Sequence, residues 1–129
     1  MTEREETVLE LISGHCGKIQ EYLLVAGNID GFMCNEMIMD AVALRVLAIG
    51  ELVKRLSQSF REEAKEIEKG MGIEPQTNWK GLAGIRDFVA HEYDNLDFEV
   101  IYDTALLEIP QLKSICDYLL NSKKTTENL

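Results

Sequence analysis

The sequence has few of the features that mark secreted or metal-bound small proteins. Its three cysteines are odd in number and widely separated, and no two of them form a Cys-x-x-Cys pair. Neither a disulfide framework nor a cysteine zinc site is therefore supported. We expect reduced, buried thiols at Cys16, Cys34 and Cys116.

Long apolar runs are missing as well. No N-terminal segment combines basic residues with an apolar stretch of signal length, and the longest apolar segment is interrupted by Asp40 and Arg45. A targeting peptide and a membrane-spanning helix are both disfavoured by this pattern. We expect a cytoplasmic protein that does not associate with a membrane.

Positive charge is scarce, because 13 lysines and arginines face 23 acidic residues and give a formal net charge of −10. Phosphate binding is driven by neutralising lysines and arginines, so broad nonspecific attraction to nucleic acid is disfavoured. Any nucleic-acid site must be local. The basic residues that could form such a site are Arg45, Lys54, Arg55, Lys80 and Arg86.

What the sequence does contain is typical of a folded helical domain. At 129 residues and 46% hydrophobic composition, the chain is long enough to bury a sizeable core as one domain. Glycine and proline are few, and no alternating β-pattern or internal repeat occurs. We predict a single domain over residues 1–129, with its core in about 5–120 and a frayed tail at 121–129.

Hydrophobic periodicity predicts an all-α, up-and-down bundle of about four to five helices. The second helix is unusual because "MIMDAVALRVLAI" is apolar almost all the way round. We therefore expect it to be a central helix or part of a self-association interface. The expected helices cover about 5–26, 32–56 with Asp30 as N-cap, 57–70, 78–95 and 97–120, the last kinked at Pro110.

The stretch "RDFVAHEY" brings together the residue types that metal-free RNA cleavage requires. On one continuous helix, Tyr93 returns to within roughly 20° of Arg86, whereas His91 lies about 140° away. Either the helix ends before His91, or another surface, such as a two-fold copy, completes the site. In such a cleft arginine would hold a phosphate and histidine would move a proton.

Simpler interpretations stand beside this one. Histidine near a helix end, arginine beside an acid and half-buried tyrosine are all common without catalysis. Asp87, His91 and Asp94 could also form a weak metal site, although we predict no metal and no cofactor, and Asp87 could instead orient the imidazole.

Two further residues are candidates for supporting roles. Arg45 lies in an apolar stretch, so it either reaches the surface or is buried with a partner such as Glu51. His15 is more simply explained as a structural or surface residue.

Arg86-x4-His91-x-Tyr93 resembles the Arg-x4-His-x-Tyr motif of the HEPN superfamily, and specifically of HepT-like toxins from prokaryotic toxin–antitoxin pairs. "MDAVALRVLAIGELVKRLSQSFRE" is similar to the second helix of that family, including the pair Gly50-Glu51. Trp79 and "LDFEVIYDTALLEIPQL" also match, so the resemblance covers about residues 5–120.

This resemblance implies a helical homodimer with metal-independent endoribonuclease activity at the interface. Arg86 would bind the scissile phosphate, and His91 would be the general acid/base with the RNA 2′-hydroxyl as nucleophile. Tyr93 matches a tyrosine that an MNT-type nucleotidyltransferase antitoxin modifies with AMP. A second hypothesis is a noncatalytic helical module that binds a nucleotide or a protein partner in the same cleft.

Overall fold

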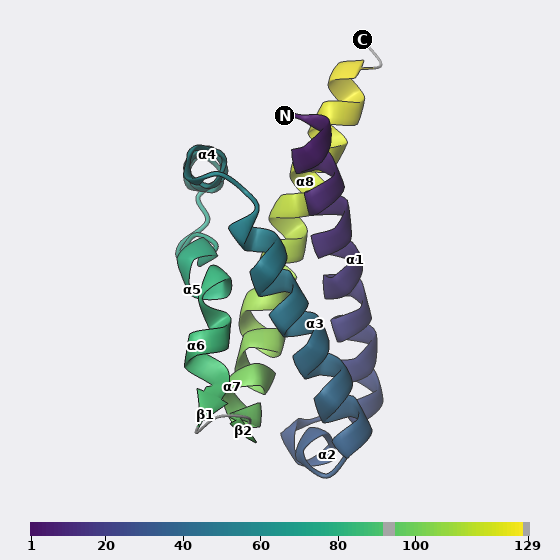
Figure 1. Ribbon diagram of the computed structural model, residues 1–129. Helices are drawn as coiled ribbons and strands as arrows, with labels where there is room; N and C mark the ends of the chain where they lie inside the picture. The colour runs from purple at the N-terminus through teal and green to yellow at the C-terminus, as the bar shows by residue number, and fades with distance from the viewer. Residues whose placement is uncertain (92–94, 128–129) are drawn as a thin grey trace.

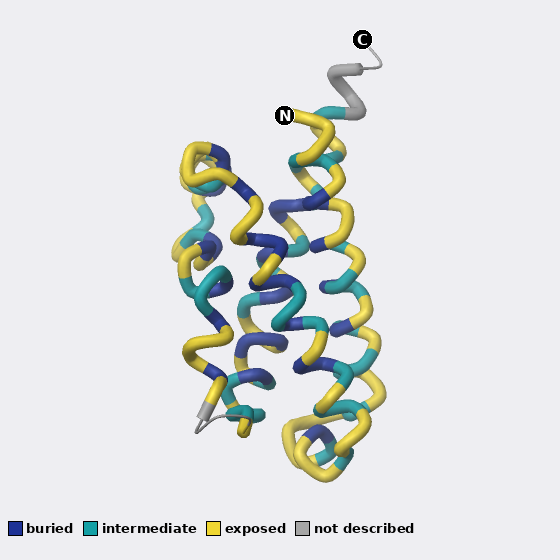
Figure 2. Tube along the Cα trace, in the orientation of Figure 1, coloured by how far each residue is buried: buried dark blue, intermediate teal, exposed yellow. Residues whose placement is uncertain are grey.

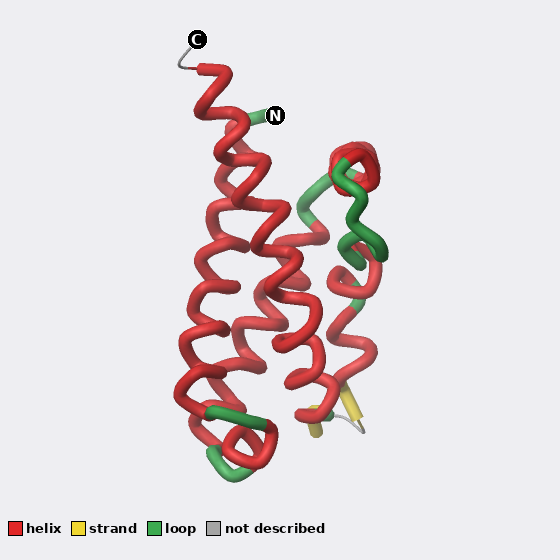
Figure 3. The backbone as a smooth tube through the Cα atoms, turned by 180° about the vertical axis from the view of Figure 1, so that it is seen from behind, coloured by secondary structure: helices red, strands yellow, loops and turns green. Residues whose placement is uncertain are grey.

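Three long helices form the main body of the protein (Figure 1). The computed structural model describes residues 1–91 and 95–127, with the backbone alone described at residue 91 and residues 124–127. Helix α1 (Glu3–Ala26) packs against both α3 (Glu36–Lys54) and α8 (Ile109–Glu127). Seen from behind, nearly the whole backbone is helical (Figure 3). The predicted all-α class is confirmed.

Helix α1 begins slightly earlier than its periodicity predicted. The side chain of Thr2 accepts a hydrogen bond from the Glu5 amide and caps the first turn. The helix ends at Gly27, whose φ of +84° lies in the left-handed region that glycine tolerates. Its buried stripe consists of Val8, Leu9, Ile12, Cys16 and Ile19.

The expected helix over 32–56 is in fact two helices, α2 (Ile29–Met33) and α3. Asn28 accepts from the Gly31 amide and caps α2, while Asn35 accepts from Ile38 and caps α3. The prediction that Asp30 caps the second helix was therefore wrong. Asn28 and Asn35 are the N-caps instead, because each has an extended backbone from which the side chain reaches a free amide of the first turn.

Helix α3 is the central helix of the fold, as its apolar sequence predicted. It contacts α1 on one side and α5 (Trp79–Ala83), α6 (Ile85–Val89) and α7 (Phe98–Asp103) on another. Two of its large apolar side chains nevertheless remain outside the core, since Met37 is 83% exposed and Leu44 is 70% exposed. They lie seven residues apart and so share one helix face.

The second layer begins with α4 (Gln58–Gly70), which Ser57 caps by accepting from the Phe60 amide. A buried carboxylate fixes the loop that follows. Glu68 accepts from the Thr77 amide at 2.8 Å, from the Thr77 hydroxyl at 2.9 Å and from Gln111 Nε2 at 3.2 Å. These bonds satisfy a carboxylate that is only 1% exposed and set the start of α5.

The single helix expected over 78–95 is broken and shorter. Helix α5 stops at Gly84, α6 stops at Val89, and Ala90 then turns to an extended conformation. Strand β1 (Ala90–His91) pairs antiparallel with β2 (Asn95–Leu96), and Asp97 N–H donates to the Val89 carbonyl. Sequence periodicity indicated no strand, because a two-residue pairing is too short to produce an alternating pattern.

The C-terminal segment is one helical run with a change of hydrogen bonding in the middle. Asp97 caps α7, a π-helix η1 (Thr104–Glu108) follows, and α8 continues to Glu127, beyond the expected core boundary at 120. The Ile109 amide bonds to the Thr104 carbonyl, five residues back. This wider turn precedes Pro110, which has no amide hydrogen to donate, so the helix accommodates proline with a π-turn.

The buried side chains form one cluster along the inner faces of the helices (Figure 2). Cys16 and Cys116 belong to it, and burial raises the pKa of the Cys16 thiol to about 12. Cys34 is exposed, so the prediction of three buried thiols was wrong at that position. No helix in the described part of the chain is long and apolar enough to cross a membrane.

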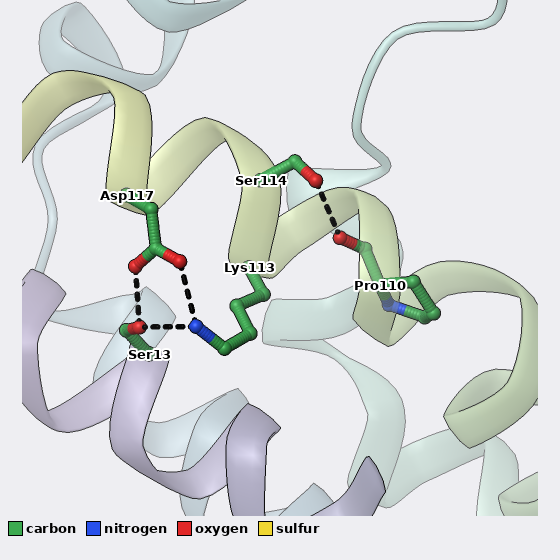
Figure 4. A network of polar contacts seen from close by, with 5 residues as sticks. All are labelled: Ser13, Pro110, Lys113, Ser114 and Asp117. Carbon is green, nitrogen blue, oxygen red and sulfur yellow. Dashed lines mark hydrogen bonds and ion pairs between the residues drawn. The ribbon is translucent and has the colours of Figure 1, made fainter.

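A small polar network joins α1 to α8 at the edge of this core (Figure 4). The Ser13 hydroxyl donates to Asp117 Oδ1 at 2.5 Å, and Lys113 Nζ donates to Asp117 Oδ2 at 2.6 Å. Burial alone would raise the pKa of the Asp117 carboxyl, but the bonds from Lys113 and Ser13 outweigh burial and lower it. The two long helices are thus held in register by charge-assisted bonds as well as by apolar packing.

Candidate active site

The short helices α5 and α6, which lead to the motif, rest directly on the central helix. At Gly50 in α3, an added Cβ would lie 2.8 Å from the Leu82 carbonyl oxygen and 2.8 Å from Ile85 Cγ2. A side chain at this position would therefore push the two helices apart. Gly50 is thus the position at which the backbone of α3 closely approaches α5 and α6.

Gly81 is crowded for a different reason. A Cβ there would meet the Asn78 side chain within 2.2 Å, because Asn78 caps α5 by accepting from the Gly81 amide at 3.0 Å. Asn78 Nδ2 also donates to Glu108 Oε1 at 3.1 Å, which joins the start of α5 to the π-helix. The motif segment is thus positioned at its start by Glu68 and Asn78 and along its length by Gly50.

Helix α6 buries one side and presents the other to solvent. Ile85 and Val89, four residues apart, are buried, whereas Arg86, Asp87 and Phe88 are exposed. No hydrogen bond or ion pair joins the Arg86 guanidinium to another residue in the described ranges 1–91 and 95–127. Its donors are therefore free to bind an anion.

His91 follows α6 after one extended residue and does not lie on the helix. Its backbone belongs to β1 and faces Asn95 across the pairing. Of the two alternatives raised by the sequence, the structure has the helix end before His91, so the 140° offset of a continuous helix does not apply. The His91 side chain and the whole of Tyr93 and Asp94 lie outside the described residues, as does the metal alternative that depends on them.

Arg45 has partners, but they are not the expected one. Its Nη1 lies 3.2 Å from His15 Nδ1, its Nη2 donates to the Tyr22 hydroxyl at 3.4 Å, and its guanidinium lies 5.9 Å from the Tyr22 ring centroid. Glu51 is exposed and pairs with Lys54 at 3.2 Å instead. The predicted pairing of Arg45 with Glu51 is thus wrong, because six residues turn Glu51 about 120° away from Arg45 on α3.

This group affects the protonation of His15. Burial, and secondly the positive charge of Arg45, lower the pKa of His15. A neutral His15 accepts the hydrogen bond from Arg45 through Nδ1. His15 is therefore a structural partner of Arg45.

Sequence reasoning missed Phe88 as a feature of this surface. Its ring is 66% exposed, and it lines a groove of about 270 Å³ between α6 and the segment α7–η1, together with Ile85, Val100 and Thr104. The spacing of Ile85 and Val89 gives no signal for this, because a residue three positions after Ile85 lies near the same helix face.

The comparisons with known proteins identify the family of the chain. The family model described as "HepT-like: Ribonuclease HepT-like" matches residues 12–119, most of the chain. The chain belongs to the HepT-like ribonuclease family. This match includes the Gly50 contact, α5, α6 and the residues of the Arg-x4-His-x-Tyr motif.

Individual relatives of this HepT-like chain have names of the same kind. A protein of Caldanaerobacter subterraneus subsp. tengcongensis named "Putative RNase" is 30% identical over 82% of this chain and 90% of its own length. A protein of Methanocaldococcus jannaschii with the same name is 34% identical over 64% of this chain and 60% of its own length. A "Probable ribonuclease HepT" of Thermococcus cleftensis is 27% identical over 65% of this chain and 67% of its own length. No solved structure gives a significant match.

Proposed function

We propose that this HepT-like chain is the toxin of a toxin–antitoxin pair and cleaves RNA internally without a metal ion. The observation that carries the proposal is the placement of Arg86. It is exposed on α6 with no partner among the described residues, and the helix ends just before His91. An unpaired arginine five residues before a histidine supplies hydrogen-bond donors for a phosphate and a proton carrier in one short segment.

The proposed reaction is an internal phosphoryl transfer. The RNA 2′-oxygen attacks the adjacent phosphorus and loses its proton to His91, while the bond from phosphorus to the 5′-oxygen breaks. The leaving oxygen takes up a proton, and the products carry a 2′,3′-cyclic phosphate and a free 5′-hydroxyl. Arg86 stabilises the charge that develops on the phosphoryl oxygens, and Asp87 is a candidate to orient the imidazole.

A homodimer is part of this proposal, with two copies of the motif lining one cleft. Exposed apolar side chains support it, since Phe88 is exposed on α6, the helix that carries Arg86, and the Met37–Leu44 face of α3 is uncovered in the single chain. Apolar surface of this kind is typical of interfaces. We expect Phe88→Glu to shift the protein towards the monomer in analytical ultracentrifugation, while Phe60→Leu in the core leaves the association state unchanged.

Tyr93 is the proposed site of regulation. Transfer of AMP to its phenol oxygen by an MNT-type nucleotidyltransferase partner would add an anionic phosphate to the motif and exclude the substrate phosphate. Co-expression with that partner should add the mass of an AMP group to the intact protein. The Tyr93→Phe variant should stay unmodified and remain active in the presence of the partner.

The decisive experiment is cleavage of a defined single-stranded RNA by purified, unmodified protein in the presence of EDTA. We expect products ending in a cyclic phosphate from the wild type and none from His91→Ala of equal thermal stability. Nucleotide binding without any cleavage would instead favour the noncatalytic binding module.

A further inference from the structure

Besides Arg86 on α6, a second group of basic residues lies on α4 and α5, the helices that precede α6. Helices α4 and α5 line a pocket of about 380 Å³. In Figure 1, α4, α5, α6 and β1 follow one another from top to bottom, so these two helices lie at the end away from β1. This volume falls in the range of small-ligand sites. The pocket is lined by Gln58, Arg61, Glu62, Lys65, Trp79 and Lys80.

Two of the lining residues each carry a hydrogen-bond donor that has no acceptor among the described residues. Arg61 Nε and Trp79 Nε1 are both buried, and neither has a hydrogen-bond partner among the described residues. The Trp79 side chain is only 1% exposed. A buried N–H without an acceptor is unfavourable, so each of these donors needs an explanation, such as a bound ion or a water molecule.

The charge around these donors favours an anion over water. Arg61, Lys65 and Lys80 are positive, and Glu62 is the single acid of the lining, at 4.0 Å from Lys65. The lining therefore keeps a surplus of positive charge in a chain of net charge −10. A water molecule would accept from the donors but would leave that surplus uncompensated, whereas a phosphate satisfies both.

The geometry points to a phosphate subsite. We propose that the pocket formed by Arg61, Lys65, Trp79 and Lys80 binds a backbone phosphate of the RNA strand at a nucleotide away from the cleaved bond. This proposal rests on the RNA cleavage proposed above. Helix α5 continues almost directly into α6, so an RNA strand held at Arg86 can run along the two helices to the pocket. It also explains how an acidic protein attracts RNA, since a local pocket needs no basic surface.

The test measures RNA binding without cleavage. A fluorescent single-stranded RNA with 2′-O-methyl groups has no nucleophile, and its affinity is followed by anisotropy over a range of salt concentrations. Three variants change the pocket: Lys80→Gln at an exposed position, Arg61→Gln, and Trp79→Phe, which removes the N–H donor. Lys69→Gln is the matched control, because Lys69 is an exposed lysine on α4 that pairs with Glu66 at 3.6 Å and does not line the pocket.

The two charge variants and the tryptophan variant should differ in a defined way. Lys80→Gln and Arg61→Gln should each weaken binding about three- to tenfold. Each should also lower the magnitude of the salt slope by about 0.7, the value for one neutralised phosphate of a single strand. Trp79→Phe should weaken binding about tenfold with an unchanged slope, because it removes a neutral donor. Equal effects of Lys80→Gln and Lys69→Gln on affinity and slope would overturn the proposal.

Two further arms separate the alternatives. If AMP binds to the wild type but not to Lys80→Gln, while the RNA salt slope of the two proteins is the same, the pocket holds a free nucleotide and the RNA assignment is overturned.

Cleavage of unmodified RNA by the wild type is measured separately. Absence of cleavage would overturn the proposed function, whereas a pocket-dependent salt slope would still uphold the phosphate subsite. Thermal melting identifies any effect of Trp79→Phe on folding. If this variant is destabilised, the affinity and salt slope of Lys80→Gln decide whether the pocket binds an RNA phosphate.

Discussion

An arginine, a histidine and a tyrosine occur together twice, once in contact within the fold and once close together in the sequence, and the two groups differ in what contacts the arginine. In the first, Arg45 contacts His15 and Tyr22 between α3 and α1, so its donors are used within the fold. In the second, which the sequence motif defines, Arg86 is exposed and has no partner among the described residues. The same residue types thus build a structural contact in one place and leave binding capacity in the other.

The largest contrast is expected between the two histidines. His91→Ala should lower RNA cleavage about 10²- to 10⁴-fold, because a positioned general acid/base contributes that much. His15→Ala should leave the cleavage rate within about twofold, although it removes a hydrogen-bond acceptor from Arg45. Both rates are measured on the same RNA at saturating enzyme. A loss of cleavage in His15→Ala at normal stability would mean that the Arg45 group belongs to the active site.

The two arginines should also behave differently. Arg86→Gln should lower kcat/KM for RNA by about 10²-fold, because it removes charge and donors from the developing phosphoryl charge. Arg86→Lys should recover part of that activity, since lysine keeps the charge but lacks the planar fork. Arg45→Gln serves as the control and should reduce thermal stability while cleavage continues. Equal kcat/KM values for Arg86→Gln and wild type would remove Arg86 from the proposed site.

Stability measurements at two glycines test how the helices that lead to Arg86 pack on α3, the helix that carries Arg45. Gly50→Ala should lower the free energy of unfolding by about 1–3 kcal/mol, because the new methyl group meets Leu82 and Ile85 at 2.8 Å. Gly14→Ala, on α1 where nothing lies within 4 Å, should raise it by about 0.5–1 kcal/mol. Urea denaturation gives both values. Stabilisation by Gly50→Ala would show that α5 and α6 are not seated on α3 as described.

The smallest effect concerns the pH dependence of stability. The folded-state pKa of His15 is lowered by burial and by Arg45, so the unfolded chain binds a proton more readily. The resulting stabilisation is complete above the ordinary histidine pKa of about 6.5 and declines as the pH falls through the lower folded value. As the pH is lowered from about 6.5, the melting temperature should therefore decrease more steeply in the wild type than in His15→Gln. In this variant an amide oxygen still accepts a hydrogen bond from Arg45. Identical pH profiles would contradict this assignment.

Much of the fold could be predicted from the sequence because helical periodicity and caps are local signals. The positions of α1 and α4, the central role of α3 and the Asp97 start of the last segment follow from apolar spacing and side-chain caps within a few residues. The predictions failed where competing caps lay close together, at Asn28, Asp30 and Asn35. They also failed where a helix stops without a strong local signal, at Val89.

The candidate site divides in the same way. The sequence by itself determined the motif residues Arg86, His91 and Tyr93 and the family to which they point, because a motif depends only on residue type and spacing. Only the tertiary structure decided that Arg45 contacts His15 and Tyr22 and that α5 and α6 pack closely on α3 at Gly50. It also decided that Arg61 and Trp79, each with an unsatisfied donor, line one pocket. Each of these features joins residues far apart in the chain, and local sequence patterns do not show which distant residues come into contact.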